Sequence, residues 1–324
     1  MKAIVHYTYG PPDGLELKEI DKPTVGDGEA LIRVHAASVN PADWRIMRGA
    51  PFVIRLVGYG LRKPKTPGLG SDVAGVVEAV GKNVTRLRPG HEVYGSGRGA
   101  YAEFACAAED QVTPKPANLT FEQAAAVPLA ATTALQGLRD IGKLQAGQTV
   151  LVIGASGGVG TFAVQIAKAL GAEVTGVCST RNAELVRSIG ADHVIDYTRE
   201  DFTRGEHRYD LIFQLAGTNT PSECRRALTP RGTLVLSSGE GRYSGVGRIV
   251  SAMASSPFVT QRLVSWVSSM KKADLLALTE LIQAGKVKPV IDRTYTLDET
   301  PAAIRYVEEG HTRGKVVINI GATD

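Results

Sequence analysis

Cysteine is scarce in this chain. Cys106, Cys178 and Cys224 are the only three among 324 residues, and none forms a C-x-x-C pair. Widely spaced cysteines in odd number argue against a disulfide framework and against a zinc site built from cysteine. We therefore expect a protein of a reducing compartment, with the cytoplasm as its location.

Long apolar runs and runs of basic charge are also missing. No apolar stretch approaches the roughly 20 residues that a membrane span needs, and the first residues are too polar for a secretory signal. The net charge is only +4, and Lys and Arg are dispersed without a run of five or six. The sequence thus predicts a protein that binds neither membranes nor nucleic acids.

The length of the chain and its changes of texture predict two domains. Short strand-like segments separated by Gly and Pro fill residues 1–118, as in a compact β-barrel-like domain. A capping-box pattern at Thr120–Gln123 opens a helix that we expect to break at Pro128. From Gln148 strands and helices alternate, which is typical of a parallel, doubly wound sheet. The tail returns to strand texture, so we expect it to rejoin the first domain.

One glycine-rich stretch organises the second domain. An apolar run, Val150–Ile153, leads into closely spaced glycines and then into helical spacing. Such a turn directs bare N–H groups and the positive end of a helix dipole at a diphosphate. The alternative is a turn that only lets strand and helix pack. We take as candidate dinucleotide-binding residues Gly154, Ser156, Gly157, Gly158, Val159 and Gly160.

The end of the next strand distinguishes between cofactors. Enzymes that use NAD tend to place an acid there, about 20 residues after the glycines, but this chain has Cys178–Arg181 and no acid. The Ser179 hydroxyl and the Arg181 guanidinium suit a 2′-phosphate, and Tyr197 adds a phenol donor. The alternative for Arg181 is a solvated residue at a helix start. The sequence favours NADPH over NADH, and Ala216 and Ser238 complete the candidate cofactor-binding set.

Several separate motifs resemble the medium-chain dehydrogenase/reductase superfamily, and within it the zinc-independent, quinone oxidoreductase-like branch. The motifs cover nearly the whole chain: Ser38–Trp44, Gly70–Val77, Gly90–Gly95, Ala124–Pro128 with Thr133–Ala134, Gly154–Gly160, Gly190–Ile195 and Gly310–Val317. The resemblance implies an α/β protein: a GroES-like β-barrel catalytic domain of residues 1–120, completed by 287–324, and a Rossmann domain of residues 121–286. It also implies an active site between them and a homodimer.

The resemblance also assigns roles to single residues. It places Thr133 near the nicotinamide ribose, and Arg313 and Lys315 near the cofactor. For the last two, the alternative is a charge pair at the start of a strand. Tyr59 falls in a loop, Phe52–Lys65, that differs among relatives and either roofs the substrate or is plain surface.

Zinc-containing relatives carry Cys where this chain has Asn40, and a His-Glu pair where it has Ser71 and Asp72. Asn and Ser are not credible zinc ligands. The relatives' four-cysteine lobe would fall near Gly95–Tyr101, where only a short link is present. We therefore expect no metal at either position.

Without a Lewis acid, exchange between carbonyl and alcohol loses the stabilisation of its alkoxide. Reduction of a conjugated C=C bond or a quinone needs less, because charge spreads into an enolate or quinol. We expect Asn40 to be an amide donor near the nicotinamide or the substrate oxygen. Asp43 is expected either to orient a group or relay a proton, or to cap the helix that starts there. Tyr59 is a further candidate donor.

The sequence thus predicts an NADPH-dependent, zinc-free reductase of an apolar quinone or α,β-unsaturated carbonyl compound. Two alternatives stay open: a zinc-free alcohol dehydrogenase or ketone reductase, and a nucleotide-binding protein with a structural or regulatory role. The acceptor and the proton donor are not predicted. The apolar segment 244–271 is a candidate interface or substrate cover.

Overall fold

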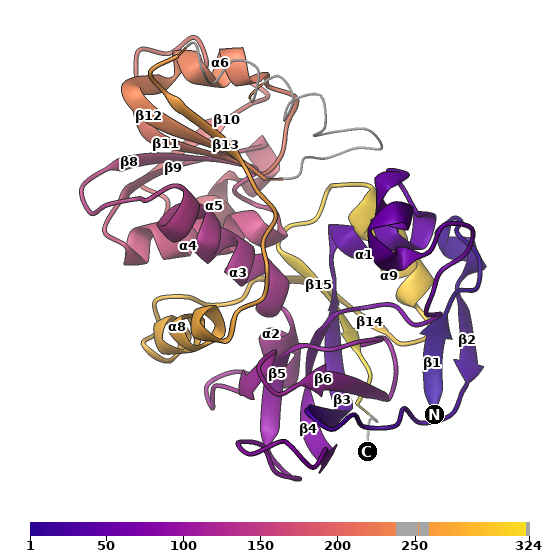
Figure 1. The fold of residues 1–324 in the computed structure, drawn as a ribbon. Coiled ribbons are helices and arrows are strands. Elements are labelled where there is room, and N and C mark those ends of the chain that lie inside the picture. The colour runs from indigo at the N-terminus through magenta and orange to yellow at the C-terminus, as the bar shows by residue number, and fades with distance from the viewer. Residues whose placement is uncertain (238–251, 253–258, 322–324) are drawn as a thin grey trace. The chain divides into compact units, whose positions relative to one another are not determined.

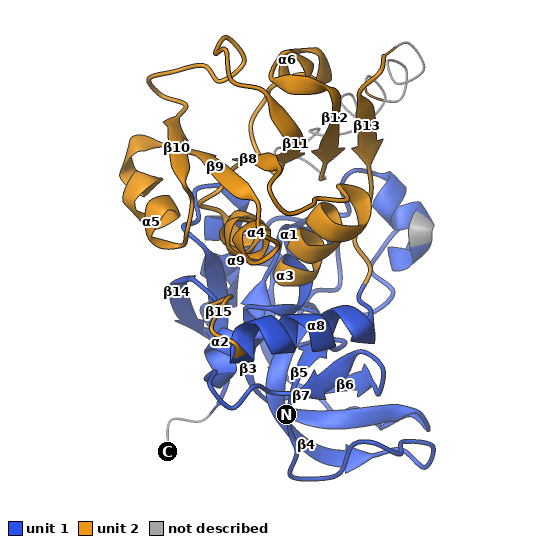
Figure 2. Ribbon diagram, turned by 90° about the vertical axis from the view of Figure 1, so that its left-hand side faces the viewer, with its two compact units in different colours: residues 1–130, 270–283, 289–324 blue, residues 131–269, 284–288 orange. Residues whose placement is uncertain are grey.

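The computed structural model describes residues 1–237, 252 and 259–321, which form two compact units (Figure 2). Unit 1 contains residues 1–130, 270–283 and 289–324, and unit 2 contains residues 131–269 and 284–288. The expected first boundary, after residue 120, lies earlier than this division. Residues 270–283, expected in the Rossmann domain, belong to unit 1.

Unit 1 is built on a mixed sheet that, within the described residues, runs β14-β15-β3-β4-β5-β7, with β6 also paired to β3. The tail strand β15 lies antiparallel to β3, with Val317 opposite Ser38, which confirms that the C-terminus rejoins the N-terminal β domain. A separate hairpin joins β1 and β2. The strands are β1 (Lys2–Val5), β2 (Glu16–Glu19), β3 (Glu29–Val39), β4 (Asp72–Val80), β5 (Glu92–Ser96), β6 (Phe104–Ala108), β7 (Val112–Pro114), β14 (Ile291–Thr296) and β15 (Lys315–Asn319).

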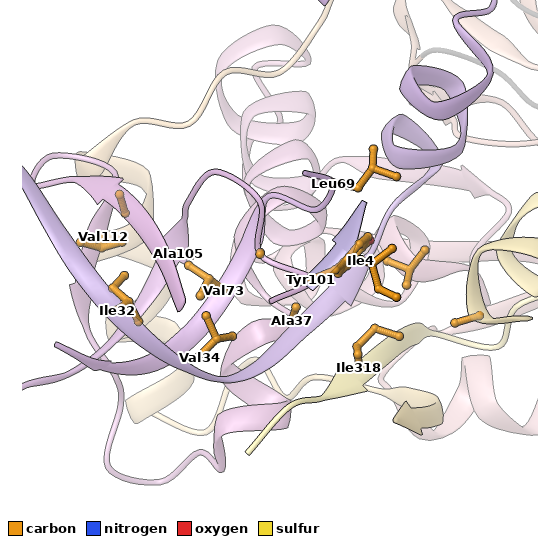
Figure 3. Close-up of a cluster of buried hydrophobic side chains, with 14 of the residues drawn as sticks. Ile4, Ile32, Val34, Ala37, Leu69, Val73, Tyr101, Ala105, Val112 and Ile318 are labelled. Atoms are coloured by element: carbon orange, nitrogen blue, oxygen red, sulfur yellow. The ribbon is translucent and has the colours of Figure 1, made fainter. Parts of the chain in front are cut away.

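Buried side chains from these strands form the core of unit 1. Ile32 and Val34 alternate along β3, and they pack with Val73 of β4 and Ile318 of β15 (Figure 3). Alternate residues of a strand point to the same face, so one face of β3 supplies the middle of this core. Tyr101 is fully buried in the same cluster.

Helices and helical turns complete unit 1. The expected capping box is present, because Thr120 Oγ1 accepts from Gln123 N at 3.2 Å while Thr120 N donates to Gln123 Oε1 at 3.1 Å. The helix it opens is interrupted before Pro128, as predicted, since proline lacks the N–H that would continue it. The elements are η1 (Pro12–Gly14), α1 (Pro41–Arg48), η2 (Arg55–Tyr59), α2 (Phe121–Ala125), α8 (Lys272–Gln283) and α9 (Thr300–Glu308), with α3 (Pro128–Leu135) crossing into unit 2.

Unit 2 contains a parallel sheet in the order β10-β9-β8-β11-β12-β13 among the described strands (Figure 1). In chain order this is 3-2-1-4-5-6, the doubly wound dinucleotide-binding arrangement, and it confirms the predicted fold. The elements are η3 (Gln136–Ile141), β8 (Thr149–Ile153), α4 (Gly158–Ala169), β9 (Glu173–Cys178), η4 (Thr180–Asn182), α5 (Ala183–Ser188), β10 (His193–Asp196), β11 (Tyr209–Gln214), α6 (Pro221–Arg226), β12 (Leu228–Leu236) and β13 (Arg262–Ser265).

Strand β13 changes the interpretation of segment 244–271. Its Leu263 pairs with Leu234 of β12 and is buried in the sheet, so this part of the segment is core. Residues 244–251 and 253–258, which carry most of the helical pattern in that segment, lie outside the described residues.

Candidate functional site

The glycine loop joins strand β8 to helix α4 in unit 2. Gly154 has φ +87°, a conformation that side chains rarely adopt. A Cβ on Gly160 would lie 2.0 Å from Gly154 O, so only glycine fits the turn as it stands. The N-cap of α4 is Gly157, and no side chain caps it in the described structure. The first N–H groups of α4 and its dipole are therefore available to an anion, which fits a dinucleotide diphosphate.

Strand β11 ends beside this loop. A Cβ on Gly154 would lie 2.6 Å from Ala216 Cβ, which places Ala216 directly against the turn. Since β8 and β11 are the neighbouring strands where the strand order reverses, this is the position at which doubly wound sheets bind ligands. Ser156 is buried beneath the loop. Ser238 lies outside the described residues.

The three residues predicted to recognise a 2′-phosphate lie at one corner of the sheet. Tyr197 N donates to Cys178 O at 3.1 Å, which joins the end of β10 to the end of β9. Ser179 is half-buried, whereas the side chains of Arg181 and Tyr197 are exposed. The three residues therefore lie just after the ends of two paired strands, with the two larger side chains exposed.

An acid near this corner escaped the sequence analysis. Asp196, the last residue of β10, accepts from the Thr180 hydroxyl, from Thr198 N at 3.0 Å and from Thr198 Oγ1 at 2.7 Å. These bonds, that from Thr180 first, lower the pKa of its carboxyl. An acid was expected only at Cys178–Arg181, directly after β9. Parallel strands end at the same edge, so the residue that ends β10 was the available signal.

Asn182 was also missed, and it links the two halves of the candidate cofactor site. Its Nδ2 donates to Ser156 Oγ at 3.0 Å and to Ser179 Oγ at 3.3 Å. The side chain is buried, and its Oδ1 has no hydrogen-bond partner among the described residues. The glycine loop and the 2′-phosphate corner are thus connected through one amide.

In unit 1, a buried polar cluster surrounds Asn40. Its Oδ1 accepts from Lys315 Nζ at 2.5 Å, and its Nδ2 donates to Asp72 Oδ2 at 2.9 Å and to Ser38 O at 3.4 Å. An ammonium only donates and a carboxylate only accepts, so these partners determine the orientation of the amide. Both ends of Asn40, which we expected to serve a ligand, are occupied by the chain itself.

Asp72 carries the negative charge of this cluster. Its carboxylate accepts from Ser38 Oγ at 2.9 Å and from Leu129 N at 3.2 Å, and Lys315 Nζ is 3.9 Å away. Burial raises the pKa of Asp72, while the charge of Lys315 opposes that shift. Burial likewise lowers the pKa of Lys315, opposed by Asp72 and Asp43. From the sequence, Asp72 was notable only because it stands, with Ser71, where zinc-containing relatives carry a His-Glu pair.

Asp43 lies beside the cluster and has a different partner. Its Oδ2 accepts from Asn40 N at 2.7 Å and from Tyr101 OH at 2.7 Å. We considered Asp43 as the cap of a helix starting at Trp44, but α1 starts at Pro41 with Asn40 as its N-cap. The first bond is the one that an N3 side chain makes to the N-cap backbone in a capping box. Burial raises the pKa of Asp43 to about 6, although both hydrogen bonds oppose it. A carboxyl with this pKa can hold or release a proton near neutral pH.

The remaining candidates lie elsewhere. Tyr59 ends η2, and its side chain is exposed, as the surface interpretation has it. Thr133 is buried in unit 2, with Oγ1 2.8 Å from Ser268 Oγ. Arg313 has an exposed side chain, and its backbone N donates to Asp292 Oδ2 at 2.8 Å. Lys315, by contrast, is fully buried at the start of β15.

Comparisons with known proteins agree with both halves of this description. Residues 26–117 match the family of alcohol dehydrogenase GroES-like domains, and residues 189–318 match the zinc-binding dehydrogenase family. The mitochondrial NAD(P)H oxidoreductase RTN4IP1 of Mus musculus is 36% identical over 324 residues, covering 90% of this chain and 82% of that protein. The 2-methylene-furan-3-one reductase of Solanum lycopersicum is 33% identical, covering 98% and 79%. This chain belongs to the medium-chain dehydrogenase/reductase superfamily, in its quinone oxidoreductase-like branch.

Solved structures of this superfamily superimpose on nearly the whole chain. The quinone oxidoreductase of Coxiella burnetii has a TM-score of 0.88 at 29% identity, covering 99% of both chains. The Escherichia coli quinone oxidoreductase complexed with NADPH has a TM-score of 0.85 at 25% identity, covering 99% of this chain and 100% of that one. The chain is therefore an NAD(P)H-dependent oxidoreductase with a GroES-like and a Rossmann domain.

The name of the second matched family raises the question of zinc. The family resemblance puts Asn40 and the pair Ser71 and Asp72 at the ligand positions of zinc-containing relatives. In this structure Asn40 and Asp72 bind the Lys315 ammonium and each other. No group of three or more His, Cys, Asp or Glu side chains among the described residues is arranged to hold a metal. The residues present therefore do not fit a catalytic zinc ion.

No helix of the described chain is long and apolar enough to cross a membrane. Because RTN4IP1 is named as mitochondrial, the cytoplasmic location stays a prediction.

Proposed function

We propose that this protein uses NADPH to reduce an apolar quinone or an α,β-unsaturated carbonyl compound. The observation that carries the proposal is the donor set around Asn40. A lysine ammonium there binds the residues at the zinc-ligand positions of metal-dependent relatives. Without a Lewis acid, acceptors that delocalise the incoming charge are favoured over simple carbonyls. The names of the tomato reductase and of the Coxiella burnetii quinone oxidoreductase support the same substrate class.

The preference for NADPH rests on the corner formed by Ser179, Arg181 and Tyr197. A bound nicotinamide would supply the hydride, and the glycine loop would hold its diphosphate against the N-terminus of α4. Arg181 and the two hydroxyl groups would bind a 2′-phosphate through charge-assisted hydrogen bonds. The bonds that Asp196 accepts from Thr180 and Thr198 engage its carboxylate at this corner. The complex of the Escherichia coli relative with NADPH supports this choice.

Within unit 1 the chain's own residues do two things. Lys315, Asp72 and Ser38 hold the Asn40 side chain, and Asp43 accepts from the Asn40 backbone N. We therefore infer that Asn40 positions the start of α1. Asp43 and Tyr101 hold a proton between a carboxyl of raised pKa and a phenol. Proton transfer is most efficient from a group whose pKa lies near the operating pH. We therefore propose that Asp43 supplies the proton that the reduced acceptor takes up. A homodimer remains a prediction from the family resemblance.

The test follows oxidation of the reduced nicotinamide at its absorbance band. NADPH and NADH are each offered with quinones, enones and simple ketones or aldehydes. We expect turnover with NADPH and the conjugated acceptors. Faster reduction of simple carbonyls would instead establish a zinc-free ketone reductase. Tight NADPH binding with no turnover of any acceptor would establish a nucleotide-binding protein without this activity.

A further inference from the structure

One exposed apolar surface stands out in unit 1. Ten large apolar side chains of the described residues are exposed, and five of them fall within a single ten-residue stretch. We call this group the apolar surface; it consists of Phe52, Val53, Leu56, Tyr59 and Leu61. Phe52 and Val53 come just before η2, whereas Leu56 and Tyr59 belong to it, so the five side chains are presented by one short segment. A concentration of this kind marks an interaction site rather than ordinary scattered exposure.

The chain holds these residues outward instead of leaving them to collapse. Tyr9 OH donates to Tyr59 O at 2.9 Å and to Gly60 O at 2.6 Å. Arg55 Nε donates to Gly49 O at 2.9 Å, and its guanidinium lies 4.5 Å from the centre of the Tyr9 ring. The same guanidinium lies 5.7 Å from the centre of the Phe52 ring. The segment is thus tied to Tyr9 and Gly49 of unit 1 through Arg55 and the Tyr9 hydroxyl.

A tight turn ends the apolar surface and begins a basic segment. Gly60 has φ +109°, and a Cβ there would lie 2.2 Å from Lys63 O, so the turn requires glycine. Arg62, Lys63 and Lys65 follow at once, with exposed side chains that have no ion-pair partner in the described part of the chain. Cations and apolar side chains are therefore presented next to one another.

The sequence around the basic segment contains no acidic residue that would neutralise its positive charge. Between Asp43 and Asp72 there is no Asp or Glu. The same stretch contains six cations: Arg45, Arg48, Arg55, Arg62, Lys63 and Lys65. Of these, Arg48 is paired with Glu308, Arg55 anchors the helical turn, and Arg45 lies 5.2 Å from the centre of the Trp44 ring. The free charge is concentrated on the three residues beside the apolar surface.

We propose that residues 52–65 dock this protein on an anionic lipid bilayer. Exposed apolar side chains flanked by Lys and Arg are the combination that lies in the headgroup region, where the apolar groups insert and the cations meet anionic lipid. A partner protein would match the apolar face, but it would need a dense acidic rim to match the cations as well. The inference goes beyond the proposed function and stands independently of it. It departs from the prediction that the protein does not bind membranes, which was based on the lack of a long apolar run.

The experiment measures sedimentation of the full chain with vesicles. We expect binding to vesicles of phosphatidylcholine and phosphatidylglycerol, weaker binding when salt is raised, and little binding to pure phosphatidylcholine. The combined variant Arg62→Gln, Lys63→Gln, Lys65→Gln should bind roughly a hundredfold more weakly, at about fivefold for each cation removed. Val53→Ser with Leu56→Ser should weaken binding by roughly tenfold or more.

Matched controls remove the same kinds of group elsewhere. Lys271→Gln, Lys286→Gln and Lys288→Gln together remove three exposed cations, and Leu276→Ser removes an exposed apolar side chain on α8. Both controls should bind vesicles like the wild type, and all variants should melt like it.

Three results would overturn the proposal. The first is equal sedimentation with neutral and anionic vesicles, or none with either. The second is a wild-type oligomer that dissociates in Val53→Ser, Leu56→Ser, which would make the surface a contact between copies. The third is loss of turnover with a water-soluble acceptor in that variant while vesicle binding is unchanged. Failure of vesicle binding with normal reductase activity would leave the proposed function intact.

Discussion

The two candidate regions differ in whether their polar groups are bonded within the chain or accessible to a ligand. In unit 1, Asn40, Asp72 and Lys315 satisfy one another and are fully buried. In unit 2, the glycine loop leaves the first N–H groups of α4 without a capping side chain, and Arg181 stays exposed. In a closed cluster the polar groups bond to one another and stabilise the fold, whereas in an open one they remain accessible to a ligand. Side-chain substitutions should therefore affect stability in the first region and cofactor binding in the second, whereas replacing a packed glycine of the loop affects folding as well.

The largest effect is expected for Lys315→Ala. The substitution leaves the Asp72 carboxylate buried without its cation, which should lower the free energy of unfolding by about 3–5 kcal/mol. Denaturant unfolding measures it, with the exposed Lys286→Ala as the control. Adding Asp72→Asn to Lys315→Met should recover part of the loss. A change as small as that of the control would show that the cluster is not a closed unit.

The second prediction concerns pH and Asp43. Its pKa rises from 3.8 to about 6 in the fold, so the folded chain binds this proton more tightly than the unfolded chain does. The resulting stabilisation is complete below about pH 4 and is lost as the pH rises through about 6, a change on the order of 3 kcal/mol. Asp43→Asn keeps an acceptor for Tyr101 but cannot ionise.

The measurement is the free energy of unfolding of wild type minus that of Asp43→Asn across this pH range. We expect the difference to fall as pH rises, because the other titrating groups contribute equally to both proteins. A difference that stays constant would mean that Asp43 does not carry the raised pKa.

In the open region, Gly160→Ala should distort the loop. The new Cβ would lie 2.0 Å from Gly154 O, so the backbone has to shift to relieve the overlap. Such overpacking should lower the free energy of unfolding by about 1–3 kcal/mol. Gly157→Ala is the matched control, because its Cβ would lie 3.5 Å from the same oxygen. Thermal unfolding without cofactor compares the two. Equal melting temperatures would show that close packing does not require glycine at residue 160.

Arg181→Ala tests which cofactor the open region takes. Loss of a charge-assisted hydrogen bond should weaken NADPH binding by roughly ten- to a hundredfold and leave NADH binding unchanged. Arg187→Ala, an exposed arginine of α5, is the control. Titration of protein fluorescence with each dinucleotide gives both constants. Equal loss of affinity for NADH would refute recognition of the 2′-phosphate by Arg181.

The smallest effect is expected for Tyr59→Phe. Its hydroxyl is on an exposed side chain, and the segment is held through the backbone carbonyl of Tyr59, which the substitution keeps. We expect kcat with the best quinone or enone acceptor to be unchanged. A clear fall in kcat with normal melting would make Tyr59 a catalytic donor after all.

Local patterns determined much of this protein from the sequence alone. The apolar run before Gly154, the capping box at Thr120 and the break at Pro128 depend on residues only a few positions apart. Such short-range chemistry is the same in any fold, so these elements could be predicted. The alternation of strands and helices predicted a doubly wound sheet, and the structure supplied its strand order. The replacements at Asn40 and Ser71 likewise argued against zinc from the sequence alone.

Only the tertiary structure decided which polar side chains are hydrogen-bonded within the chain. Lys315 meets Asn40 across 275 positions of the chain, and Asp196 meets Thr180 across two strands. Whether an amide or a carboxylate is satisfied depends on partners brought in by strand pairing, and these leave no local signature in the sequence. The same holds for the apolar surface, since only the folded structure shows that its five side chains are exposed.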